Sequence, residues 1–374
     1  MTRKSDNQAV SGAKAASQLR SLRTQIDKLD HQILKLLNER ASRAAEAGQL
    51  KTDQASEIFS PAREEEILQQ LLANHKGPLD AQTIRAIFRE LMSGSRALQK
   101  VLKVAYLGPD YSNCHLAVIE RFGTSIDFIG VGSIPAVFEE VNRGHADFGL
   151  VPLENSIDGR LSDTLEMFLR LPQIHITSEV RFRIHHHLMA NVTQQEIRRV
   201  YSRSQILSQC RNWLSKNIPH AQMVEVTSTG VAGELAQREP GAAAVASRHV
   251  AQRFNLKTLF EKIEDSLVGI SRFAVIGTHP APKSGKDKTA LLIHLGTHPG
   301  SLADALHIFK QNKVAIGVIE SYMARSGKDE AVFFLDFDGH MDDAKCKKTL
   351  DALNKHCEKV TVLGSFPAST INDE

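Results

Sequence analysis

A stripe of leucine and isoleucine residues at helical spacing is the feature that most constrains the fold of this chain. The stripe comprises Leu19, Leu22, Ile26, Leu29, Ile33, Leu36 and Leu37, and no glycine or proline interrupts the sequence before Gly48. This spacing predicts one helix from Leu19 to about Lys51, with its apolar residues on one face. A lone helix of that length would leave this face in water, so other helices or a second chain must cover it.

Capping residues predict two further helices in the same segment. Ser60 suits the N-cap of one, with Pro61 in its first turn. Asp80 suits the start of the other, in which these apolar residues share one side: Ile84, Ile87, Phe88 and Leu91. We therefore expect an all-helical domain over residues 16–101. The small and polar residues 1–15 are expected to form a disordered tail.

The pattern changes after Leu102, where short apolar runs typical of strands alternate with helical stretches. Examples of such runs are LKVAYLG, ADFGLVPLE and SRFAVIG. This alternation indicates an α/β domain over residues 102–280, followed by a linker. From Thr289 the order strand, helix, strand, strand, helix, strand predicts an α+β, ferredoxin-like domain over residues 288–374. The chain is thus expected to be multidomain, with all-α, α/β and α+β parts in that order.

Composition argues against several functional classes. The net charge of +3 over 374 residues does not indicate a nucleic-acid-binding surface. No apolar run reaches the roughly 18 residues of a membrane span, and the N-terminal residues lack the apolar core of a signal peptide. The cysteines form no C-x-x-C pair, so we expect a cytoplasmic protein with reduced thiols. His185, His186 and His187 are not accompanied by further ligands at metal-site spacing, and we expect no metal and no cofactor.

The helical segment resembles the all-helical chorismate mutases, a family in which the mutase is an intertwined helical dimer. The motifs that carry the resemblance are LRTQIDKLDHQILKLLNER, Lys51, SPARE and SRALQ. The resemblance implies a homodimer and assigns catalysis to Lys51, Glu64 and Gln99. It implies these substrate-binding residues: Arg23, Arg40, Ser60, Arg63 and Ser95. At Ser60 many relatives have aspartate instead.

These residue types suit the rearrangement of a small dianion. Chorismate rearranges through a pericyclic transition state that needs no nucleophile, so an enzyme must hold two carboxylates and compress the molecule. Arginine pairs with carboxylates in a bidentate manner. Lys51 and Gln99 can donate to the breaking ether oxygen, and Glu64 can accept from the substrate hydroxyl. Taken singly, each charged residue would be interpreted as part of the solvated face of an amphipathic helix.

The α/β segment resembles the prephenate dehydratases, which fold as two lobes with the active site between them, like periplasmic binding proteins. The motifs are AYLGPDYSNCHLAV, GLVPLENSIDGRLSDTLEMFL, VYSRSQILSQC, VEVTSTGVAGELA and ISRFAVIG. The resemblance assigns catalysis to Ser271 and the binding of a substrate carboxylate to Arg272. It implies that these residues line the cleft: Glu154, Asn155, Ser156, Ser202, Gln205, Gln209, Thr227, Ser228, Thr229 and Phe273.

Two features of this segment leave alternatives open. YSNC, RSQ and GISRF depart from the family pattern, with Ser271 in place of the usual threonine. From SRF alone, Arg272 would be interpreted as a strand arginine paired with an internal glutamate or aspartate. A lobe that prefers arogenate, or one that senses a ligand without chemistry, is the alternative to an active dehydratase.

The last segment resembles the ACT domains, which bind amino acids. HPGSLADAL and IESYM carry the resemblance, although Tyr322 and Met323 replace an arginine and a proline. It implies a phenylalanine site formed by Gly300, Ser301, Leu302, Glu320 and Ser321. A domain that serves only for packing is the alternative. The three resemblances together have the layout of the bifunctional enzyme of phenylalanine synthesis, with chorismate and prephenate as substrates and phenylalanine as inhibitor.

Overall fold

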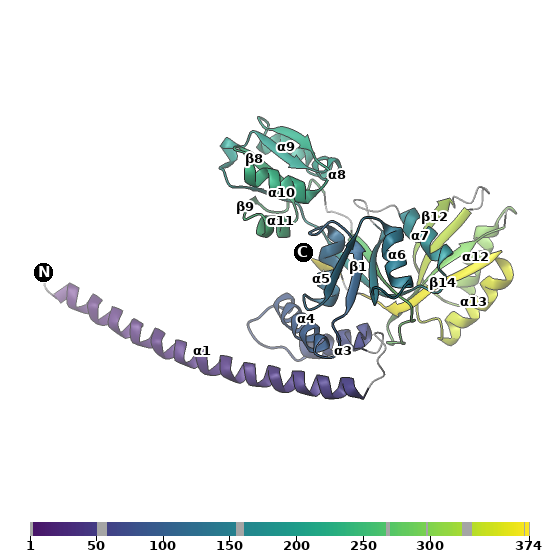
Figure 1. Cartoon of the computed structure of the whole chain (residues 1–374), viewed down its shortest axis with the longest axis horizontal. Coiled ribbons are helices and arrows are strands. Elements are labelled where there is room, and N and C mark those ends of the chain that lie inside the picture. Colours follow the sequence, from purple (N-terminus) through teal and green to yellow (C-terminus); the bar gives the residue numbers. More distant parts are fainter. Residues whose placement is uncertain are drawn as a thin grey trace.

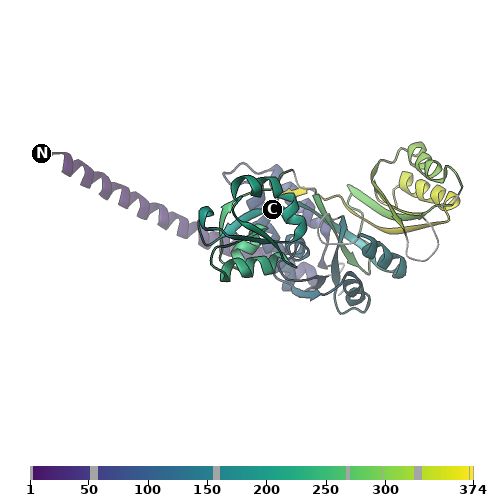
Figure 2. The same cartoon turned by 90° about the horizontal axis from the view of Figure 1, so that it is seen from above.

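The computed structural model describes residues 3–50, 58–154, 161–266, 270–296, 298–323, 331–369 and 371–373. One long N-terminal helix projects from a body that contains two α/β lobes and a C-terminal unit (Figure 1). Seen from above, that helix and the C-terminal unit lie at opposite ends of the molecule (Figure 2). No helix in the described segments combines the length and the apolar character that a membrane span requires.

The helical segment contains α1 (Arg3–Gln49), α3 (Pro61–Ala73) and α4 (Ala81–Ala97). Asp80 caps α4, since its side chain accepts a hydrogen bond from the Thr83 amide at 2.7 Å. The backbone of α1 is helical from Arg3, where the sequence led us to expect a disordered tail. Alanine is frequent and proline absent between residues 3 and 18, so intrinsic propensity favours continuing the helix.

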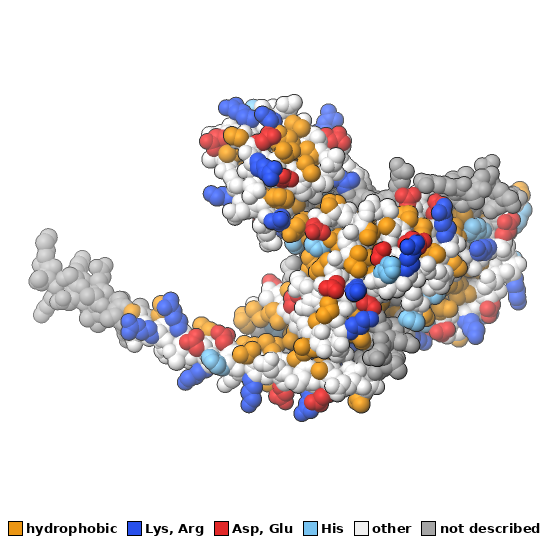
Figure 3. Space-filling model, viewed as in Figure 1, with side chains coloured by type: hydrophobic (Ala, Val, Ile, Leu, Met, Phe, Trp, Pro, Cys, Tyr) orange, Lys and Arg blue, Asp and Glu red, His pale blue; other side chains and the backbone are white. Residues whose placement is uncertain are grey.

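The apolar stripe of α1 lies in water in the single chain. Leu19, Leu22, Ile26 and Leu29 are each at least half exposed. Hydrophobic side chains therefore lie along the part of α1 that projects away from the body (Figure 3). The first constraint derived from the sequence, that something must cover this face, is not met within one chain.

The first lobe is built on a six-stranded mixed sheet with the strand order β15-β4-β10-β3-β1-β2. Its strands are β1 (Lys103–Leu107), β2 (Asp127–Val131), β3 (Phe148–Glu154), β4 (His175–Arg183), β10 (Ile270–Gly277) and β15 (Ile371–Asp373). Its helices are α5 (Asn113–Phe122), α6 (Ile134–Asn142) and α7 (Leu161–Arg170). Strand β10 lies antiparallel between β3 and β4, so the chain returns to the middle of this sheet after building the second lobe.

The second lobe is a continuous stretch of chain around a five-stranded sheet of order β7-β6-β8-β5-β9. The strands are β5 (His187–Ala190), β6 (Arg199–Ser202), β7 (Gln222–Glu225), β8 (Ala242–Ala246) and β9 (Lys257–Phe260). The helices are η1 (Gln194–Glu196), α8 (Ser204–Gln209), α9 (Arg211–Asn217), α10 (Thr229–Arg238) and α11 (Arg248–Arg253). In the space-filling view this lobe stands apart from the body (Figure 3).

The C-terminal unit has the predicted βαββαβ order. It comprises β11 (Asp287–His294), α12 (Ser301–Gln311), β12 (Ile316–Met323), β13 (Ala331–Asp338), α13 (Ala344–His356) and β14 (Lys359–Pro367). The four strands form an antiparallel sheet of order β12-β13-β11-β14. The helices α12 and α13 pack on one face of this sheet through a core that includes Phe309 and Leu353.

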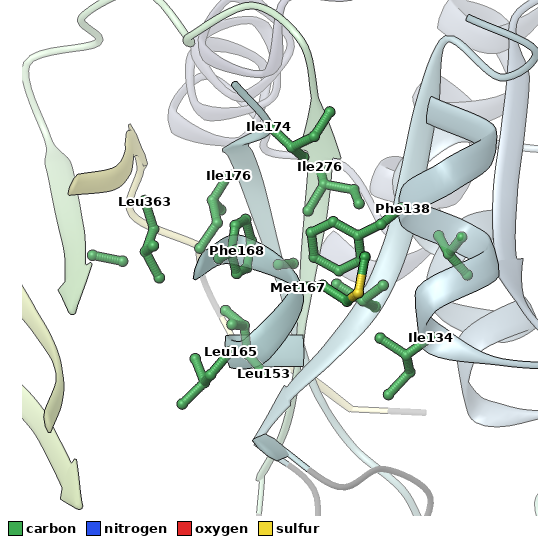
Figure 4. Packing of buried hydrophobic residues seen from close by; sticks show 14 of the residues in the cluster. Ile134, Phe138, Leu153, Leu165, Met167, Phe168, Ile174, Ile176, Ile276 and Leu363 are labelled. Atoms are coloured by element: carbon green, nitrogen blue, oxygen red, sulfur yellow. The ribbon is translucent and has the colours of Figure 1, made fainter. Parts of the chain in front are cut away.

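The other face of this sheet shares a core with the first lobe. Leu363 of β14 and Phe334 of β13 belong to the same buried cluster as Ile176 and Ile276, and Figure 4 shows Leu363 beside Ile176. The two backbones approach so closely that a Cβ on Gly364 would lie 2.3 Å from the Ile176 carbonyl oxygen. The C-terminal unit is therefore packed on the first lobe and is not attached by a linker alone.

Phe59 joins the helical segment to the first lobe. It is 2% exposed, and its ring lies 4.5 Å from that of Phe122 and 5.2 Å from that of Phe148. The guanidinium groups of Arg96 and Arg121 lie over the ring. One aromatic side chain thus contacts α4, α5 and β3 together.

We predict that Phe59→Ala lowers the free energy of unfolding by about 3–5 kcal/mol, because it leaves a cavity where the surroundings cannot collapse. Urea denaturation followed by circular dichroism measures the change. Leu79→Ala, at a side chain 51% exposed, is the control and should change the free energy by less than about 0.5 kcal/mol. Equal effects of the two substitutions would contradict the assignment of Phe59 as the anchor.

Candidate functional site

The facing surfaces of α1 and α4 bring together three of the polar residues singled out in the helical segment. Arg40 Nη1 donates to Ser95 Oγ at 3.2 Å, and Gln99 Nε2 donates to the Ala44 carbonyl at 3.0 Å. A Cβ on Gly48 would lie 2.1 Å from Gln99 Oε1, so a larger residue here would displace the Gln99 amide. Burial lowers the pKa of the Arg40 guanidinium, which favours an anionic partner for it.

The second candidate site is a cavity of about 200 Å³ between the two lobes. The first lobe contributes Leu107, Gly108, Pro109, Asp110, Ser112, Asn113 and Cys114, the second contributes Arg203, Ile206, Thr227, Ser228, Thr229, Gly230 and Ser247, and Ile184 and His186 come from the crossing between them. We call this cavity the crevice. Its lining is rich in hydroxyl groups and contains few formal charges.

Two helices direct their N-termini at the crevice, one from each lobe. Ser112 caps α5 by accepting a hydrogen bond from the His115 amide at 3.3 Å. Ser228 caps α10 by accepting one from the Val231 amide at 3.1 Å. Free amides and the helix dipole make such ends favourable for anions. Because the two ends belong to different lobes, an anion between them would contact both.

The charged and nucleophilic groups of the crevice have distinct electrostatic states. Arg203, the N-cap residue of α8, brings a guanidinium into the lining, and burial lowers its pKa. Burial also raises the pKa of the Cys114 thiol to about 12, so this thiol is neutral and not a nucleophile at physiological pH. The described lining therefore combines the cation Arg203, the carboxylate of Asp110, neutral hydroxyls and helix N-termini.

The two residues singled out in ISRFAVIG lie on opposite faces of β10. Ser271 is on the same face as Phe273 and Val275, which belong to the cluster that also contains Ile184 and Cys114 of the crevice lining. Arg272 is on the other face and is 3% exposed. Its guanidinium donates to Glu179 at 2.5 Å and to Asp336 at 2.6 Å.

Comparisons with known proteins match both the helical segment and the α/β segment. A family model described as chorismate mutase type II matches residues 22–100, and one described as prephenate dehydratase matches residues 104–281. A bifunctional chorismate mutase/prephenate dehydratase from Stutzerimonas stutzeri is 39% identical over 363 residues, covering 95% of this chain and 99% of that protein.

The chain belongs to the bifunctional chorismate mutase/prephenate dehydratase family. A member from Aquifex aeolicus is 37% identical over 361 residues, covering 95% of this chain and 99% of that protein. Among solved structures, a prephenate dehydratase from Arthrobacter aurescens in complex with L-Phe is 27% identical with a TM-score of 0.65, covering 71% of this chain and 90% of that one. A prephenate dehydratase from Staphylococcus aureus is 25% identical with a TM-score of 0.63, covering 71% and 100%.

The structure places several predicted mutase residues apart from the Arg40 group. Glu64, expected to accept from the substrate, is buried and forms an ion pair with Arg96, with Arg121 at 3.8 Å. Its carboxylate lies between the buried Arg96 of α4 and the partly buried Arg121 of α5, which need a counter-charge. Arg63 pairs with Glu66 at 2.6 Å, and Arg23 is exposed on α1. Ser60 is the N-cap residue of α3.

The expectation that Arg272 binds a substrate carboxylate in the crevice is wrong. The structure instead agrees with the alternative, a strand arginine paired with internal carboxylates. A fully buried guanidinium must be paired, and Glu179 and Asp336 on the opposite face of the sheet provide its partners. Lys51, Asn155 and Ser156 lie outside the described residues, as does the side chain of Glu154.

The remaining dehydratase predictions have mixed outcomes. Thr227, Ser228 and Thr229 line the crevice as expected. Ser202 is buried and donates to the Val245 carbonyl at 2.5 Å. Ser202 and Ser271, which is 2% exposed, are not among the residues that line the crevice. Nor are Gln205, which is exposed, Gln209, which bonds His186 at 2.8 Å, and Phe273, which stacks on Phe182 at 5.4 Å.

The three consecutive histidines lie where the chain crosses between the lobes, and Glu264 forms hydrogen bonds with two of them. His185 Nδ1 lies 2.6 Å from Glu264 Oε1, and the His186 amide donates to Glu264 Oε2 at 3.1 Å. Burial opposes ionisation, but these hydrogen bonds hold the pKa of Glu264 below its ordinary value. No metal-binding cluster of three or more histidine, cysteine or acidic residues occurs within the described residues.

Some residues of the crevice lining are not predicted from the sequence, although the motifs that contain them stand out. Arg203 and Ser112 fall in RSQ and YSNC, which were treated only as departures from the family pattern. The signal that could have found them is position, because each is an N-cap residue of a helix that follows a strand. His186 was discounted as part of a run without a metal partner.

The residues expected to form the phenylalanine site lie on the C-terminal unit. Gly300 has a φ of 91° and is the N-cap residue of α12, followed by Ser301 and Leu302. This left-handed backbone favours glycine, and it is the reason for the PG turn in the sequence. Glu320 and Ser321 lie on β12, the edge strand of the four-stranded sheet.

Proposed function

We propose that the helical segment rearranges chorismate to prephenate and that the crevice converts prephenate to phenylpyruvate, carbon dioxide and water. The observation that carries the proposal is the match to bifunctional relatives over 95% of the chain. Two separate polar sites of suitable chemistry, one helical and one between the lobes, support it. The product of the first reaction is the substrate of the second.

The mutase step needs positioning more than proton transfer. Arg40 and Gln99 approach from α1 and α4, so a bound dianion would be held between rigid helices. We propose that Lys51 and Gln99 donate to the ether oxygen as its bond breaks, where charge develops. Arg23 and Arg63 are proposed to bind carboxylates once a second chain completes the site.

The dehydratase step needs a donor for the departing hydroxyl and no strong base. We propose that Ser271 protonates this hydroxyl while the ring carboxylate leaves as carbon dioxide. Arg203 and the N-termini of α5 and α10 would hold the dianion. A hydroxyl-rich lining suits this reaction because hydroxyl groups can donate to the departing oxygen, and Arg203 offsets the charge of the lining carboxylate Asp110.

Two substitutions should separate the activities. Lys51→Ala is expected to lower chorismate consumption by on the order of 10², because a transition-state donor is lost. Ser271→Ala should lower phenylpyruvate formation by a similar factor and leave the mutase unchanged. Absorbance assays with chorismate and prephenate measure the two rates, and each activity is the folding control for the other.

The wild-type protein also tests the proposal as a whole. Prephenate that accumulates and persists when chorismate is supplied would contradict the dehydratase assignment and leave the mutase assignment standing. Arogenate supplied in a parallel assay distinguishes a lobe with the other substrate preference from an inactive one.

Arg203→Ala is expected to raise the KM for prephenate by about tenfold or more, since a charge-assisted hydrogen bond is worth about 1.5–3 kcal/mol. Steady-state kinetics measures the change. Arg211→Ala, at an exposed arginine of the same lobe outside the crevice lining, is the control. A KM for Arg203→Ala within about twofold of the wild type would show that the guanidinium does not bind substrate.

We propose that the exposed stripe of α1 is covered by a second copy of this chain. Leu19, Leu22, Ile26 and Leu29 are at least half exposed in the single chain, and an unpaired apolar helix of this length is unfavourable in water. The same pairing would bring Arg23 of one copy to the Arg40 group of the other. The mutase site would then be complete only in the dimer.

Leu29→Asp should convert the dimer to a monomer and abolish mutase activity, because it places a charge in the paired face. Sedimentation velocity measures the mass. Lys28→Ala, at the neighbouring exposed residue, should leave the dimer intact. A wild-type protein that sediments as a monomer would rule out the pairing.

We further propose that the C-terminal unit is an ACT domain that binds phenylalanine and inhibits the dehydratase. The bound L-Phe in the related dehydratase from Arthrobacter aurescens supports this, as does the motif pair on α12 and β12. Gly300, Ser301 and Leu302 would meet the ligand from one side, and Glu320 and Ser321 from β12.

A further inference from the structure

A buried cluster of charges joins the C-terminal unit to the strand that carries Ser271. Arg272 of β10 donates to Glu179 of β4 at 2.5 Å and to Asp336 of β13 at 2.6 Å. The side chains of Glu179 and Asp336 are completely buried. Lys288 of β11 approaches the second oxygen of Asp336 at 3.2 Å, and Ser369 Oγ donates to the second oxygen of Glu179 at 3.1 Å.

This cluster cannot shift one member without disturbing the others. Burial works against the charge on Arg272, but Glu179 and Asp336 more than offset it and raise the pKa of the guanidinium above its ordinary value. Arg272 is therefore always charged, and because it is almost completely buried its charge must be balanced by internal carboxylates. A displacement of Asp336 would accordingly pull on Arg272 or leave a buried charge unpaired.

The carboxylate of Asp336 is also in contact with the strand of the regulatory motif. A Cβ on Gly317 of β12 would lie 2.3 Å from Asp336 Oδ1, so β12 passes directly against this group. Glu320 follows three residues later on the same strand. On the far side of the cluster, Arg272 adjoins Ser271 through a single peptide bond. The contacts run without interruption from β12 through Asp336 and Arg272 to β10.

We propose that Asp336 and Arg272 are positioning residues through which the C-terminal unit sets the orientation of Ser271. A ligand that binds at β12 and moves this strand changes the space available to the Asp336 carboxylate. Because Arg272 is bonded to that carboxylate, the displacement reaches β10. The inference rests on the proposed dehydratase activity and its inhibition by phenylalanine. It assigns to Arg272 a role in transmission in place of the substrate contact expected from the sequence.

Asp336→Asn tests the link because it removes the charge and nearly preserves the shape. We expect the phenylalanine concentration for half-inhibition to rise by about tenfold, within the range typical of coupling between two sites. We also expect kcat for prephenate to change more than KM, since the substrate contacts are intact. Asp338→Asn, at an exposed aspartate on the same strand, should behave as the wild type.

The mutase activity of the same polypeptide reports whether the variant is folded. An inhibition curve and a kcat for Asp336→Asn that both stay within about twofold of the wild type would overturn the inference. If both activities fall in parallel, Gly317→Ala decides the matter, because it keeps every charge and crowds Asp336 and its partner Lys288. An unchanged inhibition curve for Gly317→Ala would then overturn the link, and a shifted curve would support it.

The result is distinguishable from failure of the proposed function itself. A wild-type protein without dehydratase activity would remove the function, and with it the basis of the inference. A wild-type protein that is active and inhibited by phenylalanine, with variants that do not differ from it, would remove only the link.

Discussion

The buried bond between Arg272 and two carboxylates is the interaction on which the arrangement of the domains depends. A guanidinium without access to water requires counter-charges, and the chain supplies one from β4 and one from β13. This requirement fixes how the four-stranded sheet lies on the first lobe, while the shared apolar core supplies the bulk of the adhesion. An apolar interface alone would tolerate sliding, whereas a directed pair of hydrogen bonds does not.

The crevice follows from the way the chain passes between its lobes. It crosses once after β4 and once before β10, and the Ile263 amide donates to the His186 carbonyl at 2.8 Å where the passages meet. Glu264 connects the same two passages through hydrogen bonds with the His185 ring and the His186 amide. Two adjacent passages between lobes are the arrangement typical of hinge proteins, because few residues would need to change their backbone angles. The N-termini of α5 and α10 lie on opposite sides of the crevice.

Much of the architecture could be predicted from the sequence, because it rests on periodicity and capping. The long helix, the Asp80 cap and the βαββαβ order are local consequences of spacing and residue type. The directions in which Ser271 and Arg272 point could not be predicted in this way. Alternation shows that neighbours in a strand point to opposite faces, but it does not reveal which face meets the crevice. That choice depends on Asp336, which is 64 residues away in sequence. Glu64 was misplaced for the same reason, since its partners Arg96 and Arg121 are remote in the chain.

The position of β10 has a consequence for the order in which this polypeptide can fold during synthesis. The strand lies between β3 and β4, yet it emerges from the ribosome only after the whole second lobe. The sheet of the first lobe therefore lacks a central strand until synthesis has passed the second lobe. The second lobe, whose contacts are local to residues 187–260, can form before then. Such late closure of distant contacts is slow and exposes apolar strand edges, so the nascent first lobe is the part of the chain most in need of chaperone protection.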